Sequence, residues 1–307
     1  MNPLDYSIII LNYNGEAILE RSIQHSLEAM KQSNFTGELI VADNASSDSS
    51  HEIISKFEGE MRSLNLQENR VLQGYNDAAK IADGKILILL NNDEFIDPNF
   101  LDNILEPFSK ISDLFLVCNQ CLNEGTRTYQ SGLIEAEFKK GHIWLRHEFQ
   151  PEDTQKSKLV SLGCLGAYQR KMFLEIGGFE ALFLPFYWVD ADLSYRASKR
   201  GWKCYYQPSA RAEHIHRGTI SSFDPNFVRF VNRRNKILFF WLNIEDPLLW
   251  LLHFAIFPIF VLRSLILDGT LDYLRACFWI LTHLRPIFKE KRKRQAFKKV
   301  KDSALLC

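Results

Sequence analysis

Residues 85–93 read KILILLNND, an apolar run that ends in two asparagines and an aspartate. An apolar run without polar interruption is typical of a strand that is covered on both faces of a parallel sheet. Two further runs have this form, and each also leads into polar residues: Ser7–Leu11 before Asn12–Gly15, and Glu38–Ala42 before Asp43. Ligands of open parallel sheets bind outside the carboxyl ends of the strands. The polar residues after these three strands are therefore predicted to lie at a ligand site.

Helical patterns separate the strands, and this alternation predicts βαβ units and an α/β fold. The segment from Asp113 to Ala167 is less regular and is expected to mix strands with loops over the site. The other predicted elements are a helix through Met30, a helix that begins within 43–48, a strand at Ser63–Leu66, a helix at Gly74–Ala82, helices at Lys171–Ile176 and Asp190–Lys199, and strands at Trp202–Tyr206 and Ala210–His214.

The bulk composition describes an ordered chain without a global charge. Of its 307 residues, 46% are apolar and 24% are charged, as in ordinary globular proteins. Lys plus Arg and Asp plus Glu both number 37, so nothing global points to nucleic acid. The six cysteines are scattered, which fits a reducing compartment rather than a disulfide framework. The N-terminus has no basic segment followed by a long apolar core, and it predicts a strand rather than a signal peptide.

Two aspartates at predicted strand ends are candidate ligand contacts. Asp93 ends KILILLNND, and a carboxylate held there is suited to a hard divalent cation that neutralises a leaving diphosphate. The alternative is a loop aspartate that caps the following helix. Asp43 is suited to accept hydrogen bonds from a nucleobase or a ribose, although an Asx-turn or helix cap is the structural alternative. Asp48 fits the capping role better than Asp43 does.

A second group of candidates lies in WVDADLSYR and AEHIHRG. Asp190 follows three aromatic residues, Phe186–Trp188, and partial desolvation there would raise its proton affinity, as a general base requires. Asp192 is placed to pair with Arg196 at i,i+4 instead. Both aspartates would also stabilise a helix N-terminus without any catalytic part. His214 and His216 alternate along a predicted strand, so they project to one face and would ligate a metal, hold a diphosphate or simply lie at the surface.

These motifs, in this order, resemble the successive signatures of family 2 glycosyltransferases. The resemblance extends over about residues 5–220 and rests on SIIILNYNG, VADNASSD, ENRVLQGYNDAAK with ADGKILILLNND, LGCLGAYQRKMFLEIGGFE, WVDADLSYRASKRGW and QPSARAEHIHRG. It implies a GT-A fold, that is, a Rossmann-like mixed sheet flanked by helices. It also implies an inverting, Mg²⁺- or Mn²⁺-dependent transfer from a UDP- or dTDP-linked sugar to a hydroxyl of a glycan or lipid-linked acceptor, as in polysaccharide assembly.

The resemblance also implies roles for individual residues. Asp93 matches the metal-binding position of the DxD-type motif, His214 the histidine for metal or diphosphate, and Asp190 the catalytic base. The positions that match donor-binding residues are Asn12, Tyr13, Asn14, Asp43, Asn76, Asn91 and Asn92. Two departures stand out: Val189 replaces the acidic residue that usually precedes the base, and Asn91 replaces the more usual first aspartate.

The chain changes character after residue 225, and we predict a catalytic domain over 1–225 and a helical, membrane-associating region over 226–307. Pro247–Leu267 is almost wholly apolar, Leu271–Phe288 is amphipathic, and Lys289–Lys301 is strongly basic. Peripheral attachment to an anionic cytoplasmic membrane surface fits these features best. A buried helical bundle and a membrane span are the alternatives, and Pro258 and Arg263 disfavour a span.

Two other classes of protein share parts of this pattern. A sugar nucleotidyltransferase would need a glycine-rich, basic phosphate loop after the first strand, where this chain carries NYNG. A non-catalytic scaffold that binds nucleotide sugars at the membrane would not need Asp93 and Asp190. The presence of both residues favours an enzyme.

Overall fold

The computed structural model describes residues 4–147, 158–160, 166–215, 223–267 and 269–306. Within these residues, ten strands form one mixed sheet in the order β10-β12-β6-β11-β4-β1-β2-β3, with β5 paired to β12 and β7 to β6. The strands are β1 (Tyr6–Asn12), β2 (Gly37–Asp43), β3 (Arg62–Asn65), β4 (Ile86–Asn91), β5 (Glu94–Ile96), β6 (Leu114–Asn123), β7 (Tyr129–Ser131), β10 (Lys158–Val160), β11 (Gly166–Gln169) and β12 (Lys203–His214).

The central strands β4, β1, β2 and β3 are parallel, as the apolar runs predict. Residues along β1 alternate between two cores: Ile9 belongs to one, and Ile8 and Ile10 belong to the other. Helices cover both faces of the sheet, which explains why the strands carry no polar interruption. The helices of this part are α1 (Leu19–Gln32), α2 (Ser50–Lys56), α3 (Gln73–Ile81), α4 (Phe100–Lys110), α5 (Arg170–Ile176) and α6 (Val189–Lys199).

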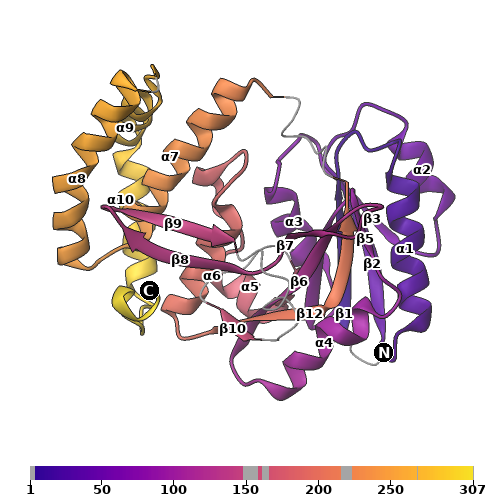
Figure 1. The fold of residues 1–307 in the computed structure, drawn as a ribbon. Helices are drawn as coiled ribbons and strands as arrows, with labels where there is room; N and C mark the ends of the chain where they lie inside the picture. The colour runs from indigo at the N-terminus through magenta and orange to yellow at the C-terminus, as the bar shows by residue number, and fades with distance from the viewer. Residues whose placement is uncertain (1–3, 148–157, 161–165, 216–222, 268, 307) are drawn as a thin grey trace.

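Four helices follow the sheet: α7 (Pro225–Asn243), α8 (Pro247–Ile266), α9 (Asp272–Thr282) and α10 (Leu284–Gln295). They stand beside the sheet, and the hairpin of β8 (Ile134–Lys139) and β9 (His142–His147) extends toward them (Figure 1). One hydrophobic core contains Tyr195 of α6, Phe239 of α7 and Ile280 of α9. The C-terminal helices are therefore packed into the core of the sheet-bearing part, and the predicted division at residue 225 stays a prediction.

Two predicted elements differ from the structure for identifiable reasons. The strands predicted at Trp202–Tyr206 and Ala210–His214 form the single strand β12, whose register against β6 shifts between Gln207 and Arg211. Pro208 has no N–H to donate at that irregularity, yet pairing resumes beyond it. The amphipathic segment Leu271–Phe288 is divided into α9 and α10. Pro286 lies within its second part and has no N–H for the hydrogen bond that a continuous helix would require.

The outermost helix, α8, is nearly uncovered by the rest of the protein (Figure 1). Among the described residues it is the one helix long and apolar enough to cross a bilayer. Its most apolar stretch of 18 residues has a mean hydropathy of 2.0, and 11% of that stretch is buried. Its two fully buried residues are the polar His253 and Ser264, and Leu249, Trp250 and Phe257 pack against the core. Many of its other large apolar side chains face outward, unlike those of the usual amphipathic helix of a globular protein.

His142 lies where β9 meets α8, and its imidazole is 1% exposed. Its ring lies 4.3 Å from that of Phe260 and 5.4 Å from that of His253, between ring centroids. Burial lowers the pKa of His142 to about 3, and the nearby charges of Lys236 and His253 add to this effect. The folded protein therefore holds a neutral imidazole over a pH range in which the unfolded chain is protonated.

We expect acid to destabilise the protein through this residue. As the pH falls below about 6.5, the unfolded chain takes up a proton that the folded state does not, so the free energy of unfolding decreases. The loss between pH 6.5 and pH 5 is about 2 kcal/mol at most. Urea unfolding of His142→Phe should show a smaller decrease over that range than the unchanged protein. Equal decreases in the two proteins would contradict this role of His142.

Candidate active site

The carboxyl ends of β1, β2 and β4 lie side by side because the three strands are parallel and in matching register. Asn12 pairs with Asp43 across β1 and β2, and Leu11 pairs with Asn91 across β1 and β4. The polar residues that follow the three apolar runs are thus brought together at one edge of the sheet, as the sequence predicts.

A chain of hydrogen bonds connects these three strand ends. Asn12 donates from Nδ2 to Oδ1 of Asp43 at 2.8 Å and accepts at Oδ1 from Nδ2 of Asn92 at 2.7 Å. Asn12 and Asp43 are both fully buried. Both Nδ2 and Oδ1 of the Asn12 side chain therefore have a partner, and this side chain fixes the spacing between the carboxyl ends of β1 and β4.

Gly15 permits the close approach of the turn to this hydrogen-bonded chain. A Cβ atom at Gly15 would lie 2.2 Å from Nδ2 of Asn92 and 2.3 Å from Oδ1 of Asn12. Asn14 lies in the same turn with a φ of 49°, and its Oδ1 accepts from the backbone N–H of Ser47 at 2.8 Å. Side-chain contacts thus hold the turn after β1 against the turn after β2. The turn after β1 is not a glycine-rich phosphate loop.

The carboxylate of Asp43 makes an Asx-type turn in addition to its bond with Asn12. It accepts from the backbone N–H of Ser46 at 3.0 Å and from the Ser46 hydroxyl at 2.6 Å. The structural alternative considered for Asp43 is therefore present, and its contact with a nucleotide stays a prediction. Asp48 accepts from the N–H of Ser50, at the start of α2, which agrees with its expected capping role.

Other residues predicted to bind the donor lie near this edge. Tyr13 is 40% exposed and follows directly on β1. Asn91 accepts from the hydroxyl of the buried Tyr75 at 3.0 Å. The side chain of Asn76 bonds instead to the backbone of Phe179. Its Nδ2 donates to the Phe179 carbonyl oxygen at 3.0 Å, and its Oδ1 accepts from the Phe179 N–H at 2.9 Å. Both ends of the Asn76 amide thus support the Phe179 segment, and its role toward a donor stays a prediction.

Asp93 and His214 meet because β5 pairs with the end of β12, where Glu94 lies opposite His214. Oδ2 of Asp93 is 3.3 Å from Nε2 of His214, and Nδ1 of His214 is 3.0 Å from Oε1 of Gln130. Burial alone lowers the pKa of His214, but the bond to Asp93 and the charge of Glu94 outweigh it and raise the pKa. His216, the second histidine of the motif, lies outside the described residues.

Glu94 is a site residue that the sequence reasoning missed. Its carboxylate accepts from the backbone N–H of Asn91 at 2.8 Å. Burial raises the pKa of Glu94 to about 7, although the charge of His214 and the Asn91 N–H oppose this rise. The one sequence signal was a second carboxylate directly after Asp93. Its importance depends on burial, which the sequence alone does not show.

The described residues contain no group of three or more His, Cys, Asp or Glu side chains placed to hold a metal ion. Asp93 and His214 nevertheless present a carboxylate oxygen and an imidazole nitrogen to the same point. Both side chains are accessible in part, with 11% of Asp93 and 24% of His214 exposed. The role of the pair toward a metal ion or a diphosphate stays a prediction.

The segment before Asp190 is shaped by α7 and α6 together. Nδ2 of the fully buried Asn235 lies within hydrogen-bond distance of the carbonyl oxygens of Phe183, Phe186 and Tyr187, at 2.6, 2.8 and 2.9 Å. Tyr187 and Trp188 both have positive φ, 64° and 69°, immediately before α6 begins. Such backbone conformations persist only where the surroundings enforce them. Asn235 supplies that enforcement and was not singled out by sequence reasoning.

Asp190 and Asp192 are both in the first turn of α6 but differ in environment. Asp190 is half-buried, whereas Asp192 is fully buried and bonded to Nε of Arg196 at 2.8 Å. The predicted i,i+4 pair is confirmed. Tyr75 links this part to the strand ends, because its hydroxyl contacts Asn91 and its ring lies 5.9 Å from that of Phe179, which precedes the Asp190 segment.

Solved structures with a similar fold are glycosyltransferases. GalNAc-T7, crystallised with UDP, GalNAc and Mn²⁺, matches with a TM-score of 0.60 and 19% identity over 78% of this chain. This chain spans about half of that protein, 48% of its length. S. aureus TarS 1–349 in complex with UDP-GlcNAc matches with a TM-score of 0.58 and 16% identity over 89% of this chain and 79% of that one. Among curated proteins, the sequence has no match.

The mixed sheet and these likenesses show a GT-A fold, as the resemblance implies. Residues 7–177 match the family described as "Glycosyl transferase family 2", which is more than half of the chain. The chain therefore belongs to glycosyl transferase family 2. The matched segment includes the strand-end asparagines and Asp93, whereas Asp190 and His214 lie beyond it.

The close approach at Gly15 generates a stability prediction. Gly15→Ala should lower the free energy of unfolding by about 1–3 kcal/mol, because the added methyl group would displace Asn92 from Asn12. Gly125→Ala is the control, since its Cβ would meet nothing within 4 Å, although its φ of 74° adds backbone strain. Urea unfolding of both variants is the measurement. A loss at Gly15 no greater than that at Gly125 would contradict the assigned contact.

Proposed function

We propose that this protein is an inverting glycosyltransferase that moves a sugar from a UDP- or dTDP-linked donor to a hydroxyl of a glycan or lipid-linked acceptor. The observation that carries the proposal is the meeting of Asp93 and His214 beside the Asp43–Asn12–Asn92 chain of hydrogen bonds. A diphosphate and its nucleoside would lie across that edge, which is where open α/β sheets bind nucleotides. The UDP and UDP-GlcNAc complexes of the similar structures support a nucleotide-sugar donor.

Asp93 and His214 are the residues that would hold a Mg²⁺ or Mn²⁺ ion. The carboxylate of Asp93 is the oxygen ligand that these ions prefer, His214 would add a nitrogen ligand once its imidazole is neutral, and the partial exposure of both leaves room for donor oxygens. When bound, the ion would neutralise the negative charge that develops on the departing diphosphate. The Mn²⁺ in the GalNAc-T7 crystal is consistent with this proposal.

Asp190 is the proposed base. It accepts the proton of the acceptor hydroxyl as that oxygen forms a bond to the anomeric carbon, and the bond from this carbon to the diphosphate oxygen breaks. Attack from the side opposite the leaving group inverts the anomeric configuration. Asp190 is half-buried in the first turn of α6, where its carboxylate would accept that proton.

We further propose peripheral attachment of the enzyme to the cytoplasmic face of an anionic membrane. Two polar residues of α8 face the protein, whereas Arg263 is exposed: Nδ1 of His253 is 2.7 Å from the carbonyl oxygen of Gly141, and Ser264 contacts Arg233 and Thr270. The outward side chains are large and apolar, and several on α8 and α9 are more than half exposed: Leu248, Leu251, Phe254, Ile259, Leu262, Ile266, Phe278 and Leu281. Such an apolar surface is stable in a membrane interface.

A groove beside this surface fits the same proposal. It has a volume of about 510 Å³ and lies between α7 and α9, with Phe230, Leu274, Phe278 and Trp279 among its lining residues. Arg275, whose side chain is 65% exposed, also lines the groove and would face lipid phosphates. A lipid-linked acceptor would have both an apolar contact and a cation available next to α7.

The basic segment supports attachment only in part. Lys291 donates to the carbonyl oxygens of Trp241 and Ile244, both at 2.9 Å, and Arg294 is nine-tenths buried. These two cations are therefore engaged within the fold. Lys293 and Lys298 are exposed but paired with Glu290 and Glu245. The other exposed cations that would meet anionic lipids are Lys289, Arg292, Lys299 and Lys301.

The catalytic proposal predicts different defects for variants of Asp190 and Asp93: the first should lose sugar transfer and the second UDP binding. Asp190→Asn should reduce sugar transfer by at least about a hundredfold, because no base accepts the hydroxyl proton, yet leave Mn²⁺-dependent UDP binding nearly unchanged. Asp93→Asn should weaken that binding. Turnover is measured with the donor that thermal-shift screening of nucleotide sugars with Mn²⁺ selects, and UDP binding is measured by calorimetry.

The control for both variants is Asp83→Asn, at a side chain that is 70% exposed, which should change neither property. Full turnover of Asp190→Asn would remove Asp190 from the role of base. Binding of a nucleotide sugar without transfer or metal-dependent hydrolysis would favour the alternative of a non-catalytic scaffold. Formation of a nucleotide sugar from a sugar phosphate would favour a nucleotidyltransferase.

The attachment proposal is tested by flotation with phosphatidylglycerol–phosphatidylcholine vesicles. The triple variant Leu251→Ser/Ile259→Ser/Leu262→Ser should lower the bound-to-free ratio at least about tenfold, because each leucine or isoleucine loses its apolar burial in the interface. Raising NaCl to about 1 M should weaken binding only in part, since salt screens the cations but not the apolar contact. Phe35→Ser/Leu174→Ser, at exposed apolar residues distant in sequence, should bind like the unchanged protein. Equal binding of the triple variant would rule out α8 as the attachment surface.

A further inference from the structure

Asp192 is a fully buried carboxylate on α6, two residues after the proposed base. It accepts hydrogen bonds from Nε of Arg196 at 2.8 Å, from Nδ2 of Asn243 at 2.7 Å and from a terminal nitrogen of Arg294 at 2.6 Å. The three donors come from α6 itself, from α7 and from α10. Three separate helices are thus joined at one carboxylate.

Helical geometry connects this carboxylate to the orientation of Asp190. Successive residues of an α-helix are rotated by about 100°, so Asp190 and Asp192 point to nearly opposite sides of α6. Asp192 points into the protein, where its partners hold it, and Asp190 is half-buried on the other side. Contacts that fix the inner side of α6 therefore also fix the direction of the outer side.

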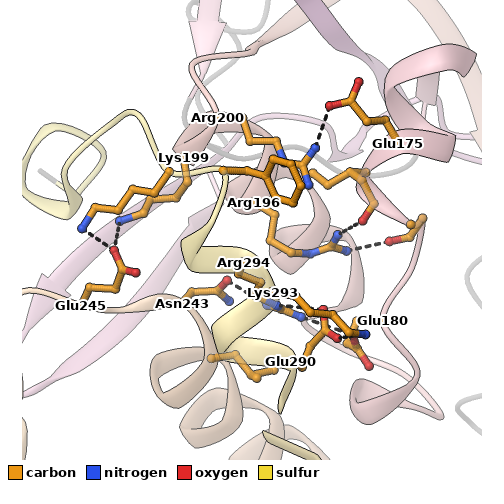
Figure 2. A pocket seen from close by; sticks show the side chains of 16 residues that line it. Glu175, Glu180, Arg196, Lys199, Arg200, Asn243, Glu245, Glu290, Lys293 and Arg294 are labelled. Carbon is orange, nitrogen blue, oxygen red and sulfur yellow. Dashed lines mark hydrogen bonds and ion pairs between the residues drawn. The ribbon is translucent and has the colours of Figure 1, made fainter. Parts of the chain in front are cut away.

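Arg294 takes part in this buried contact and does not lie on the surface. The same terminal nitrogen that contacts Asp192 donates to Oδ1 of Asn243 at 2.9 Å, and the other lies 3.4 Å from Glu180. Arg294 borders a cavity of about 330 Å³ between α10 and the ends of α5 and α6, together with Asn243, Glu180 and Glu290 (Figure 2). Desolvation opposes ionisation of Asp192, but the charges of Arg294 and Arg196 outweigh it and lower its pKa.

We propose that Arg294 is a positioning residue for sugar transfer: through Asp192 it holds α6 so that Asp190 faces the acceptor hydroxyl. This inference rests on the proposed function, because it takes Asp190 as the base. It makes the basic C-terminal helix a part of the catalytic apparatus, 102 residues after Asp192 in the chain.

A purely structural role, in which Arg294 only attaches the C-terminus, predicts something different. The C-terminal segment has other attachments: Asp302 accepts from Nζ of Lys199 at 2.6 Å and from the Tyr195 hydroxyl at 2.8 Å, and Lys291 is bonded to the end of α7. Removing Arg294 would leave these contacts in place. The segment would stay docked while α6 loses one of its three partners at Asp192.

The test compares Arg294→Met with Arg285→Met, at an exposed arginine on the same helix. Hydrogen exchange of backbone amides is followed in peptides that cover residues 188–199 and, as reference, 86–96. We expect faster exchange in 188–199 for Arg294→Met alone, with the reference unchanged. We also expect kcat to fall roughly tenfold to a hundredfold with little change in the KM for the donor or in UDP–Mn²⁺ affinity. Arg294→Lys should recover part of the kcat, because it restores the charge but not both hydrogen bonds.

Unchanged exchange in 188–199 for Arg294→Met would overturn the proposal, as would faster exchange with an unchanged kcat. If Arg294→Met unfolds as a whole, the decision rests on Arg294→Lys, and an absence of a local change in α6 there also overturns it. Asp190→Asn is measured in parallel. Full turnover of that variant refutes the proposed base, whereas the exchange data judge the contact between Arg294 and α6 independently.

Discussion

The structure depends on a requirement that holds for every buried polar side chain: its charge or hydrogen-bonding groups need partners inside the protein. Asp43 and Asn12 meet this requirement by bonding to one another across two strands. Asp192 meets it through three helices, and Asn235 through the carbonyl groups that precede α6. The same bonds that satisfy these groups place the strand ends and α6, and with them every side chain of the candidate site.

The C-terminal helices have two sides with different consequences. Their inner side completes the core of the sheet-bearing part, through residues such as Phe239 and Ile280, and supplies Asn235, Asn243 and Arg294 to the surroundings of α6. Their outer side on α8 and α9 is apolar and uncovered. A region that would be regarded as a separable anchor from composition alone is thus also a structural support for the proposed base.

The family match and the candidate site overlap only in part. The matched residues 7–177 contain the strands whose carboxyl ends form the donor side, where backbone register alone brings distant residues together. Asp190 and His214 lie beyond that segment: α7 and α10 hold α6, which carries Asp190, and pairing of β12 with β5 brings His214 to Asp93. The similar solved structures share this fold at under 20% identity.

The sequence by itself determined the parallel strands and the polar residues at their ends, because uninterrupted apolar runs such as ILILL are stable only when covered on both faces. It also determined the pair of Asp192 and Arg196, since i,i+4 spacing is local. The tertiary structure alone brought Arg294 to Asp192, withdrew Lys291 from the basic surface and desolvated Glu94 enough to raise its pKa. Each of these depends on which residues, distant in the chain, exclude water from the same place, and residue type and local spacing carry no information about that.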